Sequence, residues 1–195
     1  MKKIFLLTAI LSFLFVNSFS QTCLGEGINI SRQSQIDSFP ALYPGCSVIQ
    51  GDVTIMSGLN ITNLNGLSQI KKIAGHLWIN FNPVLTSLYG LHNLTTVGTY
   101  LEIHNNDVLK DLNYLSALGS VGTYIRISDN FLIKNLEGLN NIRTIGTDLR
   151  IMWNSHLTNL SALNGIARIP GNLVIENNDL LNNLEGLKIL SAGCH

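Results

Sequence analysis

The chain has 195 residues, equal numbers of basic and acidic side chains, and only 12% charged residues. This composition leaves no basic stripe of the kind that holds a nucleic acid, so we expect no nucleic-acid partner. Hydrophobic residues make up 46% of the chain, which is enough for one domain with a large core. After the first 20 residues, no apolar stretch is long enough for a membrane helix.

The first 20 residues have the features of a secretory signal peptide. Lys2 and Lys3 precede an apolar run over residues 4–16, which is followed by Ser18-Phe19-Ser20. The run is too short to span a bilayer. We therefore expect cleavage after Ser20 and export. A lipoprotein that is acylated at Cys23 is the alternative.

Residues 21–51 precede the repeats and are expected to form an N-terminal cap. Cys23 and Cys46 bracket this segment, and in an oxidising compartment we expect them to form a disulfide. Two free buried thiols are the alternative. Residues 33–42 predict a short helix with Ser34 as its N-cap. This helix, joined by the disulfide, would cover the open end of the core.

From residue 52 onward, one apolar pattern recurs every 24 residues without insertion or deletion. Each copy begins with an alternation such as Leu77-Trp78-Ile79, which predicts a strand with its first and third side chains inward. Leucines then follow at intervals of three, which is not the 3.6 period of an amphipathic helix. We therefore expect short extended segments joined by bends. The first inward position of each copy is Val53, Leu77, Leu101, Ile125, Leu149 and Leu173.

A fixed period of this length is typical of stacked units that bury their apolar side chains only against their neighbours. We call one 24-residue unit a rung. The pattern predicts an all-β solenoid of about six rungs over residues 52–195. Like residues then lie above one another, with rungs about 4.8 Å apart.

Two columns of polar residues mark corners of the predicted rung. Buried polar groups must be paired, so we interpret both columns as structural, bonding to the backbone of turns and to the next rung. Gly98, Gly122 and Gly146 mark a further corner before the strands. The first polar column is Asn82, Asn106, Asn130, Asn154 and Asn178, and the second is Asn63, Ser87, Asp111, Asn135, Asn159 and Asn183.

The outward side chains of the long strands vary from rung to rung, whereas the inward ones hardly change. Tyr, Trp and Arg dominate binding hot spots, and exposed aromatic rings also stack on sugars. Arg126 lies directly below Arg150, and we expect Glu102, Asp148 or an acidic ligand group to offset their repulsion. An inert, solvated face is the alternative. The candidate ligand-binding residues are Trp78, Asn80, Tyr100, Glu102, His104, Tyr124, Arg126, Arg150 and Trp153.

Cys23, the helical stretch and the run from Cys46 to Ile55 resemble the receptor L domain, the ligand-binding solenoid of the insulin and epidermal growth factor receptors. Leu85 to Gly98 is similar to the repeat of a branch of that superfamily in exported bacterial proteins. The resemblance implies a right-handed, three-sided parallel β-helix with a non-catalytic binding or adhesion role. It also implies that the protein is secreted by a bacterium, displayed on the cell surface or located in the periplasm.

A leucine-rich-repeat horseshoe is the nearest rival fold, because its period also fits. That fold needs a helix or a 3₁₀ segment in the second half of each unit and a leucine three residues before Leu77. The chain has Ala74 at that place and glycines at the equivalent positions of the next rungs. These residues favour the β-helix.

The sequence contains none of the usual catalytic motifs, and its five histidines fall in different columns. His104 and Ser128 are neighbours on adjacent rungs, but no third group orients them as a base and a nucleophile. Glu102 and Asp129 are a possible carboxylate pair for glycoside cleavage, with no constraint on their geometry. We therefore expect no enzyme, no metal and no cofactor.

We expect a secreted or cell-surface recognition or adhesion module that binds a protein or a glycan through the outward face of its long sheet. A structural spacer without a specific ligand is the alternative, and a carbohydrate-active enzyme is less favoured. Cys194 falls where a further strand would begin, either free or in an intermolecular bond. Either the solenoid is truncated there, or a partner or a second copy covers that end.

Overall fold

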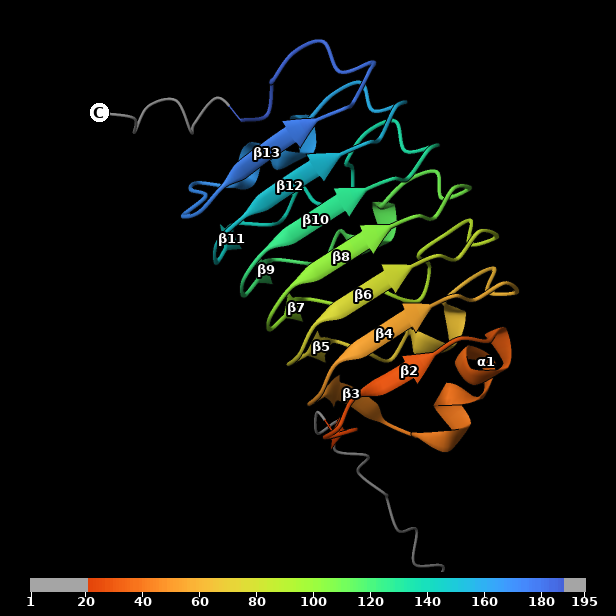
Figure 1. Cartoon of the computed structure of the whole chain (residues 1–195). Coiled ribbons are helices and arrows are strands. Elements are labelled where there is room, and N and C mark those ends of the chain that lie inside the picture. Colours follow the sequence, from red (N-terminus) through yellow and green to blue (C-terminus); the bar gives the residue numbers. More distant parts are fainter. Residues whose placement is uncertain (1–20, 188–195) are drawn as a thin grey trace, which may run out of the picture.

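A computed structural model describes residues 21–187 of the chain. The predicted signal peptide and the predictions about Cys194 lie outside these residues. Two sheets of parallel strands run the length of the described part (Figure 1), and they confirm a solenoid-like β fold. The single α-helix of the described residues lies at the end where the two sheets begin.

The larger sheet has seven strands: one comes from the cap, and the other six are the long strands of successive rungs, each hydrogen-bonded to the next. Register pairs join residues that are one period apart, such as Leu77 with Leu101 and Ile79 with Ile103. The strands are β2 (Ile28–Ile30), β4 (Val53–Met56), β6 (Leu77–Asn80), β8 (Leu101–His104), β10 (Ile125–Ser128), β12 (Leu149–Met152) and β13 (Leu173–Glu176).

The second sheet has six strands, most of them shorter than those of the larger sheet, and each precedes a strand of the larger sheet in the sequence. The glycine column lies between the two sheets, and its backbones approach very closely. A Cβ at Gly122 would lie 1.8 Å from the carbonyl oxygen of Gly98, so only glycine fits there. The short strands are β1 (Gln21–Cys23), β3 (Cys46–Ile49), β5 (Lys72–Ile73), β7 (Thr96–Val97), β9 (Ser120–Val121) and β11 (Thr144–Ile145).

The third side of the rung differs from the expected run of extended segments. Three 3₁₀ turns lie there: η1 (Asn65–Leu67), η2 (Asn113–Leu115) and η3 (Ser161–Gly165). The three-residue leucine interval fits them, because a 3₁₀ helix has three residues per turn. The rungs between them turn instead at Gly90, Gly138 and Gly186, which adopt positive φ angles. The leucine-rich-repeat rival thus shares a 3₁₀ feature, but its unit supplies one strand, whereas these rungs supply two.

The inward side chains form one continuous core, as predicted. Ile55, Ile79 and Ile103 are fully buried, and so are the leucines at intervals of three, such as Leu85 and Leu88. Burying one such side chain contributes about 1.5–3 kcal/mol. Each is packed against its own counterparts in the adjacent rungs, which explains why these positions hardly change.

The buried asparagines form the predicted ladder at the turn after each long strand. The Asn106 side-chain amide donates to the carbonyl oxygens of Ile79 (3.1 Å) and His104 (3.0 Å), and its Oδ1 accepts from the Asn82 backbone N–H at 3.3 Å. The same two carbonyl contacts recur at Asn130 and Asn154. One asparagine therefore satisfies the turn backbone of two rungs.

The second polar column has a different, local role. Each side-chain oxygen accepts a hydrogen bond from the backbone N–H two residues later, as Asp111 does from Asn113 at 3.1 Å. This contact closes an Asx or Ser turn at the entry to the third side. The prediction of a structural corner is confirmed for Asn63, Ser87, Asp111, Asn135, Asn159 and Asn183.

The cap helix α1 (Gln33–Leu42) spans the predicted residues, but Ser34 is not its N-cap. The N-cap is Arg32, because the Gln35 side-chain oxygen accepts from the backbone N–H groups of Ser31 (2.8 Å) and Arg32 (3.1 Å). This contact places the N-cap two residues before the predicted one. Ile36 is fully buried, so α1 closes the end of the core.

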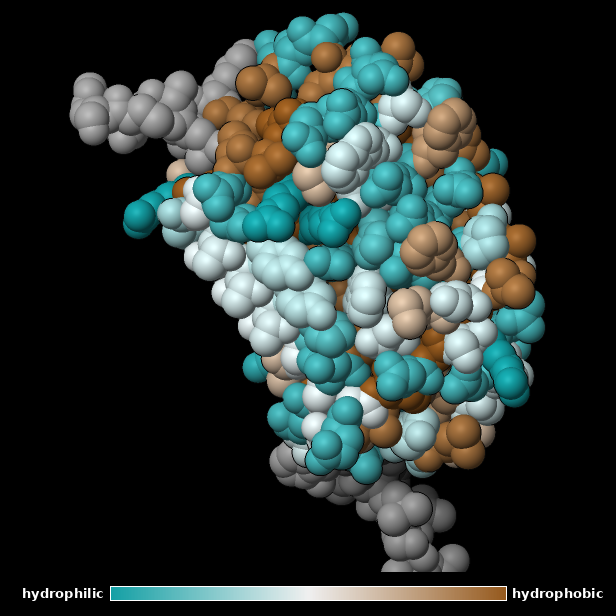
Figure 2. Space-filling view, viewed as in Figure 1, coloured by the Kyte–Doolittle hydropathy of each residue, from teal (hydrophilic) through white to brown (hydrophobic). Residues whose placement is uncertain are grey.

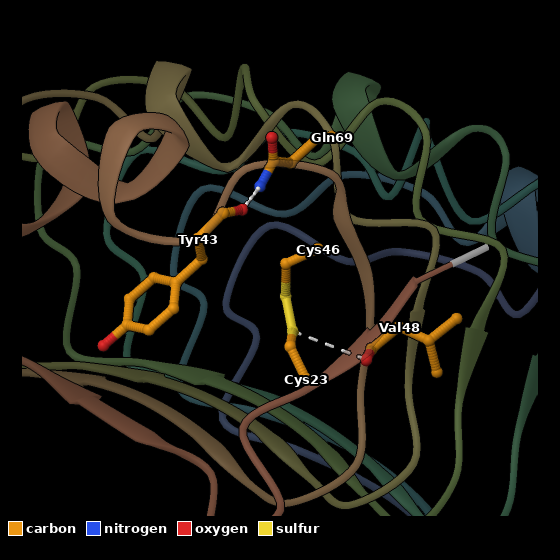
Figure 3. Close-up of a disulfide and its surroundings, with 5 residues drawn as sticks. All are labelled: Cys23, Tyr43, Cys46, Val48 and Gln69. Atoms are coloured by element: carbon orange, nitrogen blue, oxygen red, sulfur yellow. Dashed lines mark hydrogen bonds between the residues drawn. A yellow bond between two sulfur atoms is a disulfide. The ribbon is translucent and has the colours of Figure 1, made fainter. Parts of the chain in front are cut away.

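A disulfide joins Cys23 to Cys46, as predicted, with Cα atoms 5.7 Å apart. The Cys23 sulfur lies 3.6 Å from the carbonyl oxygen of Val48 (Figure 3). Nearby, the Gln69 side-chain amide donates to the carbonyl oxygen of Tyr43 at 2.7 Å. The disulfide thus joins β1 to β3 within the cap, and the hydrogen bond from Gln69 ties the cap to the first rung.

Candidate functional site

The outward face of the larger sheet is broad and mostly polar (Figure 2). Each strand from β6 to β12 buries its first and third residues and leaves the second half-exposed. That second position holds Trp78, Glu102, Arg126 and Arg150. We call the outward surface of β4 to β12, with the residue before each strand, the sheet face.

The fourth residue of each strand was expected to be exposed, and that expectation is wrong for the middle strands. Asn80 is 4% exposed, His104 is 9% exposed, and Ser128 is fully buried. Larger neighbours cover them, because the Trp78 ring stacks over His104 and the Arg126 Nε donates to the Ser128 hydroxyl at 3.1 Å. Asn80 and His104 therefore support the sheet face from below.

His104 is held neutral by its partners. The Trp78 indole N–H lies 2.7 Å from His104 Nε2 and can only donate, so Nε2 must accept. A neutral ring then carries its proton on Nδ1. Burial lowers the pKa of His104, and the positive charge of Arg126 lowers it further.

Aromatic rings stack along the residue that precedes each strand. His76 lies over Tyr100 with ring centroids 4.5 Å apart, and Tyr100 lies over Tyr124 at 4.9 Å. The Arg150 guanidinium continues this row, 5.8 Å from the centre of the Tyr124 ring. His76 was absent from the predicted site, although it occupies the same column as Tyr100 and Tyr124.

Charged side chains of the sheet face have bonding partners within the protein: one forms an ion pair and another accepts a hydrogen bond. Arg150 contacts the Asp148 carboxylate at 2.6 Å, as expected, and this contact lowers the pKa of Asp148 after the larger effect of the Asn172 backbone N–H. Glu102 instead accepts the hydroxyl of Tyr124 at 2.7 Å. Burial raises the pKa of Tyr124, and the hydrogen bond to Glu102 raises it further.

Trp153 follows β12 and lies on a different surface from the other predicted site residues. It adopts a positive φ of 53°, is 44% exposed, and borders a hollow of about 240 Å³ with Asn105 and Asp129. Phe81 occupies the equivalent place after β6. Sequence reasoning missed Phe81 and Phe131, and the signal that reveals them is their position beside the asparagine ladder.

The chemistry of the sheet face suits contact with a ligand better than reaction with one. His104 and Ser128 are register neighbours, but each already has a different partner. Within residues 21–187, no group of three or more His, Cys, Asp or Glu side chains is arranged to hold a metal ion. None of the helices in that range is long and apolar enough to cross a membrane.

Comparison with known proteins agrees with the first rungs of the repeat. The family model of the Receptor L domain matches residues 45–99. This stretch belongs to the receptor L-domain superfamily. The match starts beside Cys46 and includes β4, β6 and β7, so the predicted superfamily is confirmed there. Neither a curated protein nor a solved structure matches the chain.

The receptor L domain is a ligand-binding module without catalytic activity. The family match therefore supports a non-catalytic, ligand-binding role for this chain, and the disulfide fits an extracellular domain.

Proposed function

We propose that the chain is an exported recognition or adhesion module that binds a protein or a glycan through the sheet face. The observation that carries this proposal is the row of stacked rings from His76 to Tyr124, which ends under Arg150. Aromatic and arginine side chains dominate binding energy at interfaces, and rings held by their neighbours lose little entropy on binding.

The geometry of that row favours a protein ligand over a glycan. A sugar stacks on an open ring face, but the faces of Tyr100 are covered by His76 on one side and Tyr124 on the other. The rings therefore present their edges to the ligand. Glu102, which is bonded to Tyr124, and Arg150, which is bonded to Asp148, add charges to this surface. Such charges orient a ligand and select between ligands more than they raise affinity.

The proposal extends to the location and limits of the domain. Disulfides persist in oxidising compartments, so the Cys23–Cys46 bond supports export, with residues 1–20 as the signal peptide and a bacterial cell as the source. Residues 21–51 form the cap and residues 52–195 the solenoid. We infer about six rungs from the repeat. We infer a right-handed coil because connections between parallel strands are almost always right-handed.

We also propose a partner or a second copy at the β13 edge. Leu173, Leu180 and Leu184 are exposed there, and a sheet edge with exposed aliphatic side chains is a template for association. Sedimentation of the purified chain over a range of concentrations tests this part independently of the sheet face.

The main test uses ligands selected from a display library of extracellular proteins and from a glycan array. Affinity is then measured for the wild type and for a Trp78→Ala/Tyr100→Ala/Arg150→Ala variant. We expect binding to weaken by at least about tenfold, because these side chains supply the exposed ring edges and the free side of the guanidinium.

A matched control changes outward residues of the second sheet, as Thr96→Ala/Ser120→Ala/Thr144→Ala. This variant should bind as the wild type does, and circular dichroism should show both variants folded. Undiminished binding of a selected protein ligand by the sheet-face variant would remove the site assignment. Failure of every probe with folded wild type would favour a structural spacer, and turnover of a polysaccharide would favour an enzyme.

A further inference from the structure

A second surface runs beside the sheet face, along the turns that follow the long strands. These turns are stacked by the asparagine ladder, so residues one period apart lie about 4.8 Å from each other. We call this surface the turn edge, and its residues are Phe81, Asn105, Asp107, Asp129, Phe131 and Trp153. In Figure 2, hydrophobic residues alternate with polar ones along the margin where the strands of Figure 1 end.

Large aromatic rings are openly exposed on the turn edge. Phe81 is 56% exposed, Phe131 is 54% exposed, and Trp153 is 44% exposed. Unlike the tyrosines of the sheet face, these rings are not stacked face to face on one another. Phe81 meets His104 edge-on, and Phe131 meets His156 edge-on.

Two of these rings occupy backbone positions that disfavour them. The residue before each ladder asparagine has a positive φ, and the other members of that column in the later rungs are Asn105, Asp129 and Asn177. Asn and Asp tolerate this conformation, whereas Phe81 and Trp153 do so at a cost. Aromatic side chains there are not required by the turn itself, which asparagine would form equally well.

The rings border two neighbouring hollows. One, of about 260 Å³, is lined by Phe81, Pro83, Asn105 and Asp107. The other, of about 240 Å³, is lined by Asn105, Asp107, Asp129, Phe131 and Trp153. The hollows share Asn105 and Asp107, so they form one continuous surface that crosses several rungs.

Two carboxylates, those of Asp107 and Asp129, line the hollows. Among the residues that the structure describes, no hydrogen bond or ion pair engages the carboxylate of Asp107 or Asp129. The residues that line the two hollows include no basic side chain. The surface therefore offers hydrogen-bond acceptors and ring faces, and it repels anions.

We propose that the turn edge binds a glycan that carries no anionic groups. The apolar face of a sugar ring packs on an exposed aromatic face, and sugar hydroxyls donate strong hydrogen bonds to carboxylates. Open rings that alternate with free carboxylates over successive rungs match a linear chain of sugar units. This site lies apart from the sheet face and does not rest on the proposed function.

The test is isothermal titration calorimetry of the full chain with defined oligosaccharides. The uncharged probes are cellohexaose, chitohexaose and mannohexaose, and oligogalacturonate of the same length is the anionic probe. We expect saturable binding of at least one uncharged probe and none of oligogalacturonate. Trp153 fluorescence in a Trp78→Phe background should shift with the same probe, because Trp78 and Trp153 are the only tryptophans.

The principal variant is Phe81→Asn/Trp153→Asn, because asparagine suits the positive φ and should leave the fold intact. We expect its affinity for the bound probe to fall by at least about tenfold. Asp107→Asn/Asp129→Asn preserves shape while removing both charges, and it should also weaken binding. The sheet-face variant Tyr100→Ala/Arg150→Ala should bind the glycan as the wild type does.

Several results would overturn the assignment. They are no binding of any uncharged probe, unchanged affinity in both turn-edge variants, or equal binding of oligogalacturonate. Loss of glycan binding in the sheet-face variant would move the site to that face. If the turn-edge variants lose only a protein ligand, the turn edge is a protein interface and the glycan assignment is wrong.

Discussion

The inward columns and the sheet face are built on the same strands, yet they follow opposite rules. Ile79, Ile103 and Ile127 repeat without change because each packs against its own counterpart. At the adjacent outward position, Trp78, Glu102 and Arg126 all differ. Stacking therefore fixes which residue types face inward. The outward residues are free to differ between rungs, so they can determine which ligand is bound.

The largest effect should come from a charge placed inside the stack. Ile127→Lys buries an ammonium group in the middle of the core, where no partner can compensate the lost hydration. We expect a loss of about 4 kcal/mol or more in the free energy of unfolding, or no cooperative transition at all. Urea unfolding followed by circular dichroism measures this loss.

The control for that substitution is Arg126→Lys, at the neighbouring outward position. It should change the unfolding free energy by only about 0.5 kcal/mol. If both substitutions were equally damaging, the distinction between inward and outward positions would fail.

The asparagine ladder should come next. Asn130→Ala removes donors to the carbonyl oxygens of Ile103 and Ser128 and leaves the Asn106 backbone N–H without its acceptor. Each unsatisfied buried group costs about 1–3 kcal/mol, so we expect a total of roughly 3 kcal/mol or more. Asn135→Ala, which breaks one local turn bond, should cost only about 1 kcal/mol. Equal losses in the two columns would contradict their different roles.

The disulfide should have an effect of similar or smaller size, confined to the cap. Cys23 and Cys46 are separated by 23 residues, and opening a loop of that length costs about 3 kcal/mol in the chain-entropy model. In a Cys23→Ser/Cys46→Ser variant, amide hydrogen exchange should accelerate in α1 and β3 first. Faster exchange that begins instead in β10 would show that the cap does not protect the open end.

A smaller effect should appear on acidification. The pKa of His104 is lowered in the folded state, so the unfolded chain binds more protons between the folded value and the ordinary value of about 6.5. Stability is therefore lost as the pH falls below about 6.5, and the loss is complete below the folded pKa. Melting temperatures at pH 7.5 and pH 5 measure it.

His104→Gln serves as the matched variant, because its amide oxygen can still accept the Trp78 indole N–H. This variant should lose part of the pH dependence, whereas His156→Gln should retain it. An unchanged pH dependence in His104→Gln would assign the effect to other groups.

The repeat was enough to predict the long strands, the inward core and both polar corners, because stacking forces equivalent residues into equivalent environments. The disulfide was predicted separately, from the two cysteines that bracket the cap. It did not predict the 3₁₀ turns, since leucines at intervals of three suit both extended bends and 3₁₀ helices. The useful signal was the alternation of Gly90 and Gly138 with Tyr114 and Ala162 in one column. Gly90 and Gly138 turn the chain at positive φ, whereas Tyr114 and Ala162 lie in 3₁₀ turns; Gly66, in the first rung, lies in the 3₁₀ turn η1 and departs from this rule.

The sheet face was harder to predict because its burial depends on side-chain packing rather than on strand alternation. Alternation places Asn80, His104 and Ser128 outward, but the Trp78 ring and the Arg126 side chain cover two of them. The turn edge was missed for a related reason. Phe81 reads as a residue after a strand, and only the stacking of turns brings it near Asp107.

The most direct test of in-register stacking is a pair of engineered cysteines on the sheet face. Arg126 and Arg150 are register partners on β10 and β12, whereas Arg126 and Val174 are two strands apart. Adjacent strands lie about 4.8 Å apart, within the range that a disulfide spans, and alternate strands do not. In a Cys194→Ser background, Arg126→Cys/Arg150→Cys should form an intramolecular disulfide on mild oxidation, and Arg126→Cys/Val174→Cys should not. Cross-linking of the second pair, or of neither, would contradict the stacked solenoid.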